Sequence, residues 1–384
     1  MMKKMLSEVC DIQYGYAFDS ANFSADQGIP LIRIRDVVRG FSETYTTEVC
    51  DQEYIVNDGD ILIGMDGEFN IAIWKGGKAY LNQRVCRLLP KGEMDAMYLY
   101  YFMPKALKTI EDKTPFVTVK HLSAKELNKI VVPVPPLEKQ KKVATCLQRL
   151  DELISLRKQQ LAKLDKLVKS RFIEMFGDPI SNPKNLPVKT LKQLSTLITN
   201  GNTPKGGSEN YVENGILFLR SQNVWRNRIE LDDVAYIDEA THRSLKKSSL
   251  RYKDILITKT GRINTENSSL GRAALYLGKD NSANINGHVY LVRLDGSVVP
   301  EYVVTILTSE EYRKYIRKVC VGGIDKRQIN LDQVEDFPII LPSFELQEQF
   351  ASFVEQVDKS KFEIQKSLEK LETLKKALMQ KYFG

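Results

Sequence analysis

The chain of 384 residues contains one segment twice, and this repeat constrains its fold more than any other feature. Residues 134–140, Val-Pro-Pro-Leu-Glu-Lys-Gln, return as residues 341–347, Leu-Pro-Ser-Phe-Glu-Leu-Gln. Pro135 matches Pro342, an offset of 207 residues, and the same offset places Phe176 on Phe383. Two similar segments of this length are expected to fold into two similar units.

Weaker repetition extends upstream of these segments. Residues 28–33 resemble residues 215–220, residues 60–63 match residues 254–257, and residues 82–85 resemble residues 286–289. Each copy therefore consists of one variable globular module followed by one long segment rich in Leu, Lys and Glu.

Composition sets broad limits on the protein. With 42% hydrophobic and 27% charged residues the chain is typical of globular proteins, and its net charge of +7 favours a polyanionic partner. The five cysteines contain no Cys-x-x-Cys pair, so we expect reduced thiols and not a disulfide framework. No run approaches the roughly 20 apolar residues of a membrane span. We therefore expect no membrane association and a cytoplasmic location.

Local patterns predict a mixed α+β fold for both modules. Short apolar runs bounded by Gly, Asp and Asn predict strands, among them residues 31–34, 61–63, 71–74 and 85–89. Helices are predicted at residues 94–108 and 122–128, and a single helix at residues 300–320 of the second module. Strands and helices of this kind in one module belong to the α+β class.

A long helix is predicted after each module. The first runs from about Glu138 to Phe176 and stops at Gly177-Asp178-Pro179. Apolar residues recur in alternating steps of three and four, which favours a coiled coil, although an amphipathic helix lying on a core has a similar pattern. Arg157, Lys361 and Lys375 interrupt the two seams. The predicted seam residues are Leu147, Leu150, Ile154, Leu161, Leu164 and Val168, and then Val354, Val357, Ile364, Leu368 and Leu371.

The path of the chain sets the orientation of this pair. The first helix leads from the first module to the second, and the second helix leaves the second module. If the helices pair, they must be antiparallel and pseudo-two-fold symmetric. Two recognition units related in this way could read two half-sites about 34 Å apart on DNA.

These features resemble the specificity subunit of a type I restriction-modification system, over essentially the whole chain. The resemblance rests on the duplicated module, the Gly-Asp-Ile-Leu-Ile type of strand, the Pro-containing segments at 132–136 and 339–342, and the Glu-x-Gln helix starts. It implies target recognition domains at residues 1–134 and 179–341, and conserved spacer helices at residues 135–178 and 342–384.

The same resemblance implies a function and a set of partners. Each recognition domain would read one half of a bipartite double-stranded DNA target with an unspecified gap. Two adenine-methylating modification subunits would dock on the chain, and restriction subunits would join the full complex. S-adenosylmethionine would bind the modification subunit, and this chain would carry no cofactor.

The motifs of catalysis are missing from the sequence. An Asn/Asp-Pro-Pro-aromatic loop and a phosphate-binding Gly-x4-Gly-Lys-Ser/Thr loop are both absent, and the three histidines are too scattered for local metal-ligand spacing. We therefore expect a noncatalytic chain without a metal. Alternatives are a self-sufficient methyltransferase or nuclease, a coiled-coil adaptor that binds only proteins, and a specificity component of a related DNA-modification system.

Candidate DNA-binding residues lie in loops that combine Arg, Lys, Asn or Gln with Gly, because these side chains bond base edges and phosphates. Residues 259–264 are the best candidate for base reading, with a solvated loop as the alternative. In the second module the candidates are Lys205, Arg220, Gln222, Asn223, Arg226, Lys259, Thr260, Arg262, Asn264, Lys326 and Arg327. In the first they are Arg33, Arg35, Arg39, Asp66, Glu68, Asn70 and Lys120.

The two modules differ in charge at matched positions. Met65-Asp66-Gly67-Glu68 stands where the second module has Lys259-Thr260-Gly261-Arg262. We therefore predict an asymmetric target, in which Asp66 or Glu68 accepts a hydrogen bond from cytosine N4, with a structural turn as the alternative.

Overall fold

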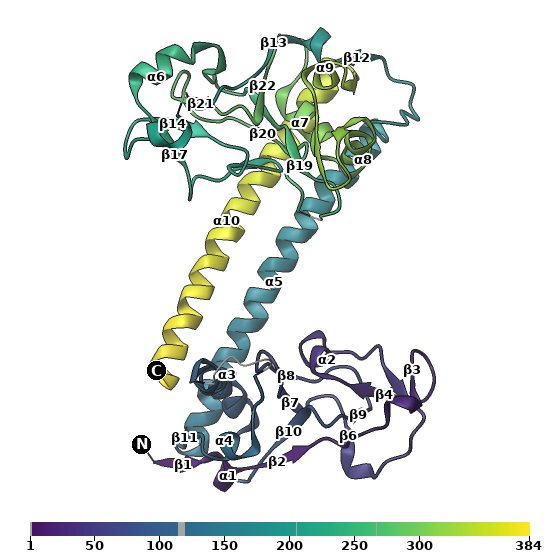
Figure 1. The fold of residues 1–384 in the computed structure, drawn as a ribbon, viewed down its shortest axis with the longest axis vertical. Helices are drawn as coiled ribbons and strands as arrows, with labels where there is room; N and C mark the ends of the chain where they lie inside the picture. The colour runs from purple at the N-terminus through teal and green to yellow at the C-terminus, as the bar shows by residue number, and fades with distance from the viewer. Residues whose placement is uncertain (1, 114–119, 205, 266) are drawn as a thin grey trace. The chain divides into compact units, whose positions relative to one another are not determined.

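The computed structural model describes residues 2–113, 120–204, 206–265 and 267–384, and Figure 1 shows its elements. The chain divides into two compact units, Met1–Gln159 with Gln365–Gly384, and Gln160–Ile364. Each unit contains one globular module and one half of each long helix. Both modules combine sheets and helices, which confirms the predicted α+β class.

The first module is built on an antiparallel four-stranded sheet of order β2-β10-β7-β8. A five-stranded sheet of order β3-β5-β4-β9-β6 adjoins it, with β4 and β9 parallel. The elements are β1 (Lys3–Met5), α1 (Leu6–Val9), β2 (Cys10–Tyr14), η1 (Ser20–Asn22), β3 (Phe23–Ser24), β4 (Ile29–Ile32), α2 (Ile34–Arg39), β5 (Tyr45–Thr46), η2 (Gln52–Tyr54), β6 (Ile55–Val56), β7 (Ile61–Gly64), β8 (Ile71–Ile73), β9 (Ala79–Leu81), β10 (Val85–Pro90), α3 (Ala96–Lys113), α4 (Ala124–Asn128) and β11 (Val131–Pro133).

The second module repeats this plan with a four-stranded sheet of order β13-β22-β18-β20 and a second sheet of order β17-β14-β21. The elements are β12 (Val188–Thr190), η3 (Lys192–Leu194), β13 (Ser195–Asn200), η4 (Gly207–Asn210), β14 (Ile216–Leu219), β15 (Val224–Trp225), β16 (Arg228–Ile229), β17 (Ala235–Ile237), α6 (Glu239–Ser244), η5 (Lys246–Ser248), β18 (Ile255–Thr258), β19 (Thr260–Arg262), β20 (Ala273–Leu275), β21 (Ala283–Ile285), β22 (Val289–Leu294), α7 (Pro300–Thr308), α8 (Glu310–Val319), β23 (Val321–Gly322), β24 (Lys326–Gln328), α9 (Leu331–Glu335) and β25 (Pro338–Ile340).

Two local predictions were wrong. The helix predicted over residues 300–320 is two helices, because Ser309 has an extended backbone and its hydroxyl accepts a hydrogen bond from Tyr312 N at the start of α8. The strand predicted over residues 31–34 ends at Ile32, because Arg33 is the N-cap of α2 and its N–H bonds the Asp36 carboxylate. In both cases a side chain bonded to the backbone outweighs the apolar pattern.

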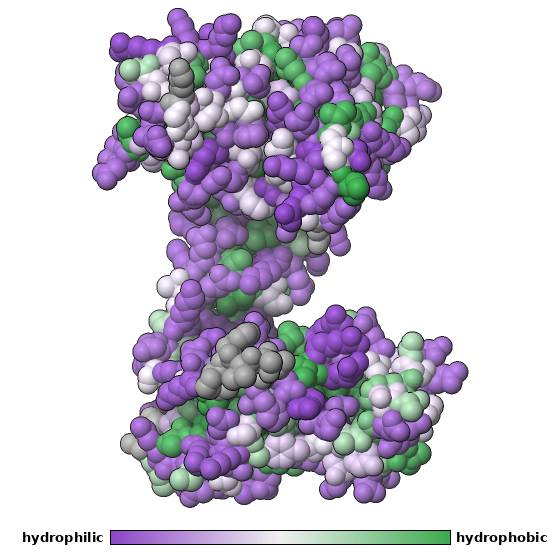
Figure 2. All heavy atoms as spheres, viewed as in Figure 1, coloured by the Kyte–Doolittle hydropathy of each residue, from purple (hydrophilic) through white to green (hydrophobic). Residues whose placement is uncertain are grey.

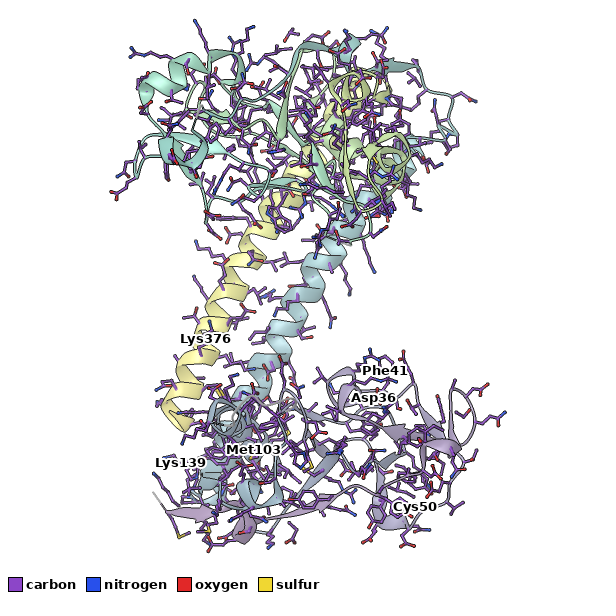
Figure 3. The ribbon with its side chains drawn as sticks, in the orientation of Figure 1. Asp36, Phe41, Cys50, Met103, Lys139 and Lys376 are labelled. Carbon is purple, nitrogen blue, oxygen red and sulfur yellow. The ribbon has the colours of Figure 1, made fainter. Side chains whose placement is uncertain are left out.

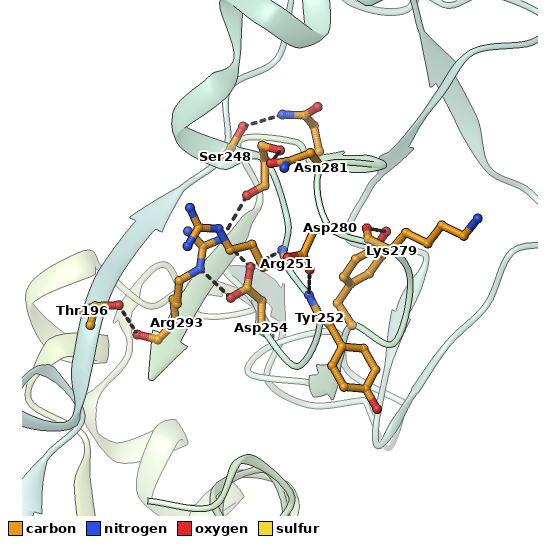
Figure 4. A network of polar contacts seen from close by, with 12 residues as sticks. Thr196, Ser248, Arg251, Tyr252, Asp254, Lys279, Asp280, Asn281 and Arg293 are labelled. Atoms are coloured by element: carbon orange, nitrogen blue, oxygen red, sulfur yellow. Dashed lines mark hydrogen bonds and ion pairs between the residues drawn. The ribbon is translucent and has the colours of Figure 1, made fainter. Parts of the chain in front are cut away.

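The aspartate of the repeated Asp-Ile-Leu-Ile strand has the same role in both modules. Asp254 is buried, and its carboxylate receives Arg293 Nε and Nη2 at 2.9 and 2.7 Å and Arg251 N at 2.6 Å (Figure 4). In the first module Asp60 accepts Arg87 Nη1 at 2.9 Å and Asn57 N at 2.9 Å. The carboxylate therefore fixes the turn before the strand to the neighbouring strand of the sheet.

The long helices α5 (Leu137–Phe176) and α10 (Phe344–Phe383) pass from one unit into the other. The start of α5 and the end of α10 complete the core of the first module, where the Phe383 and Tyr98 rings lie 5.1 Å apart. The end of α5 and the start of α10 do the same in the second, where Phe176 lies 5.0 Å from Tyr302. Each core thus contains one helix from each copy of the repeat.

A buried glutamine fixes the start of α5 to the first module. Gln140 is fully buried; its Oε1 accepts from Asp95 N at 2.9 Å and its Nε2 donates to Glu93 O and Pro135 O at 2.9 and 2.8 Å. This one buried amide bonds three backbone groups, of which Pro135 O lies in a fully buried contact.

Its repeat partner does the same at the start of α10. Gln347 Oε1 accepts from Val299 N at 3.0 Å, and its Nε2 donates to Pro342 O at 3.0 Å. The glutamine shared by the two Glu-x-Gln motifs is therefore structural: it fastens the start of each long helix to its module.

Within each unit the helices run antiparallel and are joined by ion pairs at positions where polar residues enter the seams. In the first unit Lys375 bonds Asp151, and Lys158 lies 3.0 Å from Glu372. In the second, Lys361 Nζ lies 2.7 Å from Asp165. All eleven predicted seam residues are buried or half-buried, with Leu147, Leu150, Val357 and Leu368 fully buried. Among the described helices none is both long and apolar enough to cross a bilayer.

A tyrosine adds a third group to one of these ion pairs. The Tyr101 hydroxyl donates to Asp151 Oδ2 at 2.9 Å. Burial, and then this bond to the carboxylate, raise the pKa of Tyr101 far above its usual value, so the phenol remains a donor well above neutral pH. The contact joins α3 of the globular module to the helix pair.

Replacing Gln140 with Met removes the buried amide and its bonds to Asp95 N, Glu93 O and Pro135 O. We expect the variant to lose about 2 kcal/mol of unfolding free energy, measured by urea denaturation. Gln148 is exposed on the same helix, so its change to Met should stay within about 0.5 kcal/mol. Equal effects of the two substitutions would contradict this role of Gln140.

Candidate nucleic-acid interface

Two segments predicted separately as DNA contacts lie side by side in the second module. β19 pairs with β24, with Thr260 opposite Gln328, Gly261 opposite Arg327 and Arg262 opposite Lys326. β23 pairs with the other edge of β24, which makes a three-stranded sheet. Residues 260–262, expected in a loop, are therefore a strand, and the sheet holds their side chains in fixed register.

Glycine at position 261 is required by a close approach within this sheet. A Cβ atom there would lie 2.3 Å from Leu270 N, which is far inside contact distance. The Ser269 hydroxyl also donates to Thr260 O at 2.7 Å. The segment after the strand is thus packed directly against β19, and the glycine shared by the two modules permits it.

The candidates on this sheet differ in how freely they face solvent. Arg262 is exposed, with Nε 3.4 Å from the exposed Asp325 carboxylate, and Lys326 and Asn264 are exposed as well. Lys259 is half-buried, with Nζ 5.8 Å from the centre of the Tyr290 ring. Arg262, Lys326 and Asn264 therefore present donors to an incoming ligand from one small surface.

Arg327 is turned into the protein instead. Its Nε donates to Gly323 O at 2.8 Å and its Nη1 to Cys320 O at 3.4 Å. The guanidinium therefore fastens the β23–β24 hairpin, a role that the sequence does not reveal.

The first module has the same arrangement with different charges. Gly67 N donates to Lys120 O at 2.9 Å. This contact corresponds to the pairing of Gly261 with Arg327 in the second module. Asp66 Oδ1 lies 2.5 Å from His121 Nδ1, and Asp66 Oδ2 lies 3.3 Å from Arg84 Nη1. The structure thus joins Asp66 to His121, and it adds Arg84, which the sequence pattern did not single out.

The other candidates of this surface divide into free and engaged side chains. Glu68 is exposed. Lys120 Nζ donates to Glu111 O at 2.6 Å, and the half-buried Asn70 accepts Gly64 N through its backbone oxygen at 2.8 Å. Glu68 is therefore the more accessible of the two acidic candidates, since Asp66 lies between Arg84 and His121.

A second group of candidates in the second module converges on one carboxylate. Arg220 Nη2 and Gln222 Nε2 donate to Asp233 at 2.9 and 2.7 Å, and the Arg220 bond and then the Gln222 bond lower the pKa of Asp233. Asn223 is buried, where its Oδ1 accepts Arg220 N at 2.9 Å, so this side chain shapes the turn. Arg226 is half-buried and lies 3.2 Å from Glu310.

The matched turn in the first module carries three exposed arginines. Arg33 precedes α2, Arg35 Nη2 donates to Thr44 Oγ1 at 3.2 Å, and Arg39 Nη1 lies 3.0 Å from Glu43. Asp36, labelled in Figure 3, is buried and caps the turn as Asn223 does in the second module. The helix that carries Arg35 and Arg39 packs on β7 and β8 of the four-stranded sheet.

Lys205 lies outside the described residues. Within the ranges that the structure describes, no group of three His, Cys, Asp or Glu is placed to hold a metal ion. On the face shown in Figure 2, hydrophilic side chains cover most of each globular module, as an interface for a polar ligand requires.

Comparison with known proteins gives one consistent family. The family model described as the type I restriction modification DNA specificity domain matches residues 1–166 and 183–376. The chain is 27% identical to the specificity subunit of the type I restriction enzyme EcoBI from Escherichia coli, covering 98% of this chain and 84% of that protein. It is 24% identical to the MjaVIII specificity subunit from Methanocaldococcus jannaschii, covering 91% and 87%.

Solved structures show the same fold. The type I restriction-modification S subunit from M. genitalium superimposes with a TM-score of 0.64 at 14% identity, covering 100% of this chain and 96% of that chain. A chain from a study of complex assembly and conformational transition of the type I R-M system gives a TM-score of 0.57 at 16% identity, covering 100% and 97%.

The engaged state of Arg327 can be tested directly. In Arg327→Ala the hairpin loses its bonds to Cys320 and Gly323, so amide hydrogen exchange across residues 320–328 should become roughly tenfold faster, because a charged donor contributes about 1.5 kcal/mol or more. The exposed neighbour Lys326, changed to Ala, serves as the control and should leave exchange unaltered. Unchanged exchange in both variants would show that Arg327 does not hold the hairpin.

Proposed function

The chain belongs to the type I restriction modification DNA specificity domain family, and from that membership we propose that it is the specificity subunit of a type I restriction-modification complex. Each globular module reads one half of a bipartite double-stranded DNA target. The helix pair sets the gap between the half-sites and docks the modification subunits.

The observation that supports this function most directly is the doubled surface at Gly67 and Gly261. In both modules the residues that follow the Asp-Ile-Leu-Ile strand pair with a later segment of the module. Asp66 pairs with His121 in the first module, and residues 260–262 pair with residues 326–328 in the second. The two modules share this backbone pairing, whereas the exposed side chains are Glu68 in one module and Arg262 with Lys326 in the other. A constant frame that carries different donors and acceptors suits two readers of unlike half-sites.

Membership in this family also supports a division of labour between subunits. The similar curated proteins are specificity subunits, and one similar structure comes from work on assembly of the type I R-M system. We assign adenine methylation to two modification subunits that bind S-adenosylmethionine, and DNA cleavage to restriction subunits, with this chain noncatalytic and without a cofactor. The complex acts in the cytoplasm, where its DNA lies.

The covalent path supports the role of the helices as a ruler. Each helix begins in the core of one module and ends in the core of the other. A change in helix length therefore acts on the distance between modules without altering either reading surface. The alternatives, an adaptor that binds only proteins and a specificity component of a related DNA-modification system, are separated from this function by the following experiment.

Co-expression of the full chain with a modification subunit of its system, followed by mapping of methylated adenines in the host genome, tests the function. We expect methylation at one asymmetric motif with a fixed gap. A symmetric motif would contradict unlike readers, and a pure adaptor would produce no sequence-selective methylation. A different modified base would indicate the related modification system.

The same assay tests the ruler. One heptad inserted into both helices, after Gln159 and after Ile364, should lengthen the gap by about 3 base pairs, since seven helical residues span about 10.5 Å and base pairs are about 3.4 Å apart. The control is a variant in which the exposed residues of one heptad are replaced without any change in helix length. It should leave the gap unchanged. A change in either half-site would contradict separate reading and spacing.

Arg262 and Lys326 should affect DNA binding in different ways. Arg262→Ala should relax base preference within the second module's half-site, at a cost of about 1–3 kcal/mol, whereas Lys326→Ala should weaken binding to all sequences and reduce the slope of log K against log salt by about 1. Lys247 is an exposed lysine of the same module, and Lys247→Ala is the control. Identical effects at positions 262 and 326 would contradict the distinction between base and phosphate contacts.

A further inference from the structure

We propose that Arg272 is a positioning residue of the second module. Its buried guanidinium stacks on Trp225 and holds residues 267 and 268, which belong to the segment that supports β19. Arg262 thereby keeps the orientation needed to read its half-site. This inference rests on the proposed function and adds a residue that the sequence did not single out. It concerns how base preference is maintained, and not which group touches DNA.

The contacts of Arg272 are those of an internal clamp. The residue is 8% exposed. Its Nε donates to Ser268 O at 3.1 Å, its Nη2 donates to Asn267 O, and its Cζ lies 3.8 Å from the centre of the Trp225 ring. A planar guanidinium can serve two carbonyls along its edge while one face stacks on an indole, which an ammonium group cannot do.

A short series of contacts links the residues that Arg272 bonds to strand β19. Leu270 N donates to Ser268 Oγ at 3.1 Å in the stretch that Arg272 holds. This stretch packs against Gly261, and Ser269 Oγ donates to Thr260 O at 2.7 Å. Holding residues 267 and 268 therefore fixes the backbone on which β19, and with it Arg262, rests.

Trp225, on which Arg272 stacks, is also held by hydrogen bonds of its own segment. Trp225 Nε1 donates to Gln222 O at 3.0 Å, and Asn227 N donates to Ala273 O at 2.9 Å, next to Arg272 in the chain. The β15–β16 hairpin is thus joined to β20 by backbone and to the reading segment by the Arg272–Trp225 stack. Two candidate segments that lie far apart in the sequence, residues 225–228 and 259–264, meet through one side chain.

The length of the segment explains why the second module benefits from this restraint. In matched positions Thr258 N donates to Arg272 O, and Gly64 N donates to Asn70 O. Thirteen residues separate Thr258 from Arg272, but only five separate Gly64 from Asn70. The longer segment has more conformational freedom to lose, so it needs an added restraint that the short turn does not.

Burial also excludes Arg272 from contact with the ligand. Desolvation, and then repulsion from the nearby Arg226, lower the pKa of Arg272, which stays charged because an arginine starts so high. Two of its nitrogens and one face of the guanidinium are already engaged inside the protein. A direct phosphate or base contact would require the loop to open and leave the carbonyls of residues 267 and 268 unpaired.

The test uses the full chain co-purified with its modification subunit and a library of random-sequence DNA duplexes. For Arg272→Lys we expect discrimination against mismatches in the second module's half-site to fall from the roughly 10- to 100-fold of a specific contact toward equal binding. The other half-site, the gap and the salt slope should not change. Trp225→Phe keeps an aromatic face and should retain discrimination, whereas Trp225→Leu should lose it as Arg272→Lys does.

The control is Arg243→Lys, an exposed arginine on α6 of the same module, which should match the wild type. A salt slope reduced by about 1 with discrimination intact would show that Arg272 is a phosphate contact and overturn the proposal. Full discrimination in Arg272→Lys and Trp225→Leu would overturn it as well. If one variant fails to fold, by circular dichroism, the other decides. Absence of any selected motif for the wild type would instead reject the proposed function itself.

Discussion

The structure depends on one exchange of hydrophobic contacts: the aromatic end of each long helix completes the core of the module at which it ends. Phe176 packs on Tyr302 and Phe350, and Phe383 packs on Tyr98, at matched positions of the repeat. A buried aromatic side chain of this kind is worth about 3–5 kcal/mol relative to alanine. Neither copy of the repeat therefore has a complete core unless it receives a helix end from the other copy.

Polar groups add direction to this hydrophobic exchange. The amide of Gln140 sets the exit of α5 from its module, and Lys375 and Lys361 enter the seams where an aspartate of the other helix meets them. Such partly buried pairs contribute little net stability, because desolvation offsets much of the attraction. They do penalise a shifted register, since a slip would leave lysines of the seam unpaired among apolar residues.

The two candidate DNA-binding surfaces share a backbone pairing and differ in their exposed side chains. The backbone pairing of Gly67 with Lys120 corresponds to that of Gly261 with Arg327, while the exposed side chains nearby differ in charge. Several sequence candidates turned out to be part of the frame. Asn223 and Arg327 satisfy backbone groups of their own loops, which a pattern of residue types does not distinguish from a ligand contact. Polar residues next to glycine serve both purposes.

The repeat by itself determined the tandem α+β modules, the two long helices and their antiparallel order, because periodicity and chain path are properties of the sequence. Only the tertiary structure decided that residues 260–262 and 326–328 form one sheet, and that Arg272 joins the segment behind β19 to Trp225. The strand pairing links positions more than 60 residues apart through backbone hydrogen bonds, and backbone groups are identical in every residue except proline. Their pairing leaves almost no trace in residue type, so it appears only once the chain is folded.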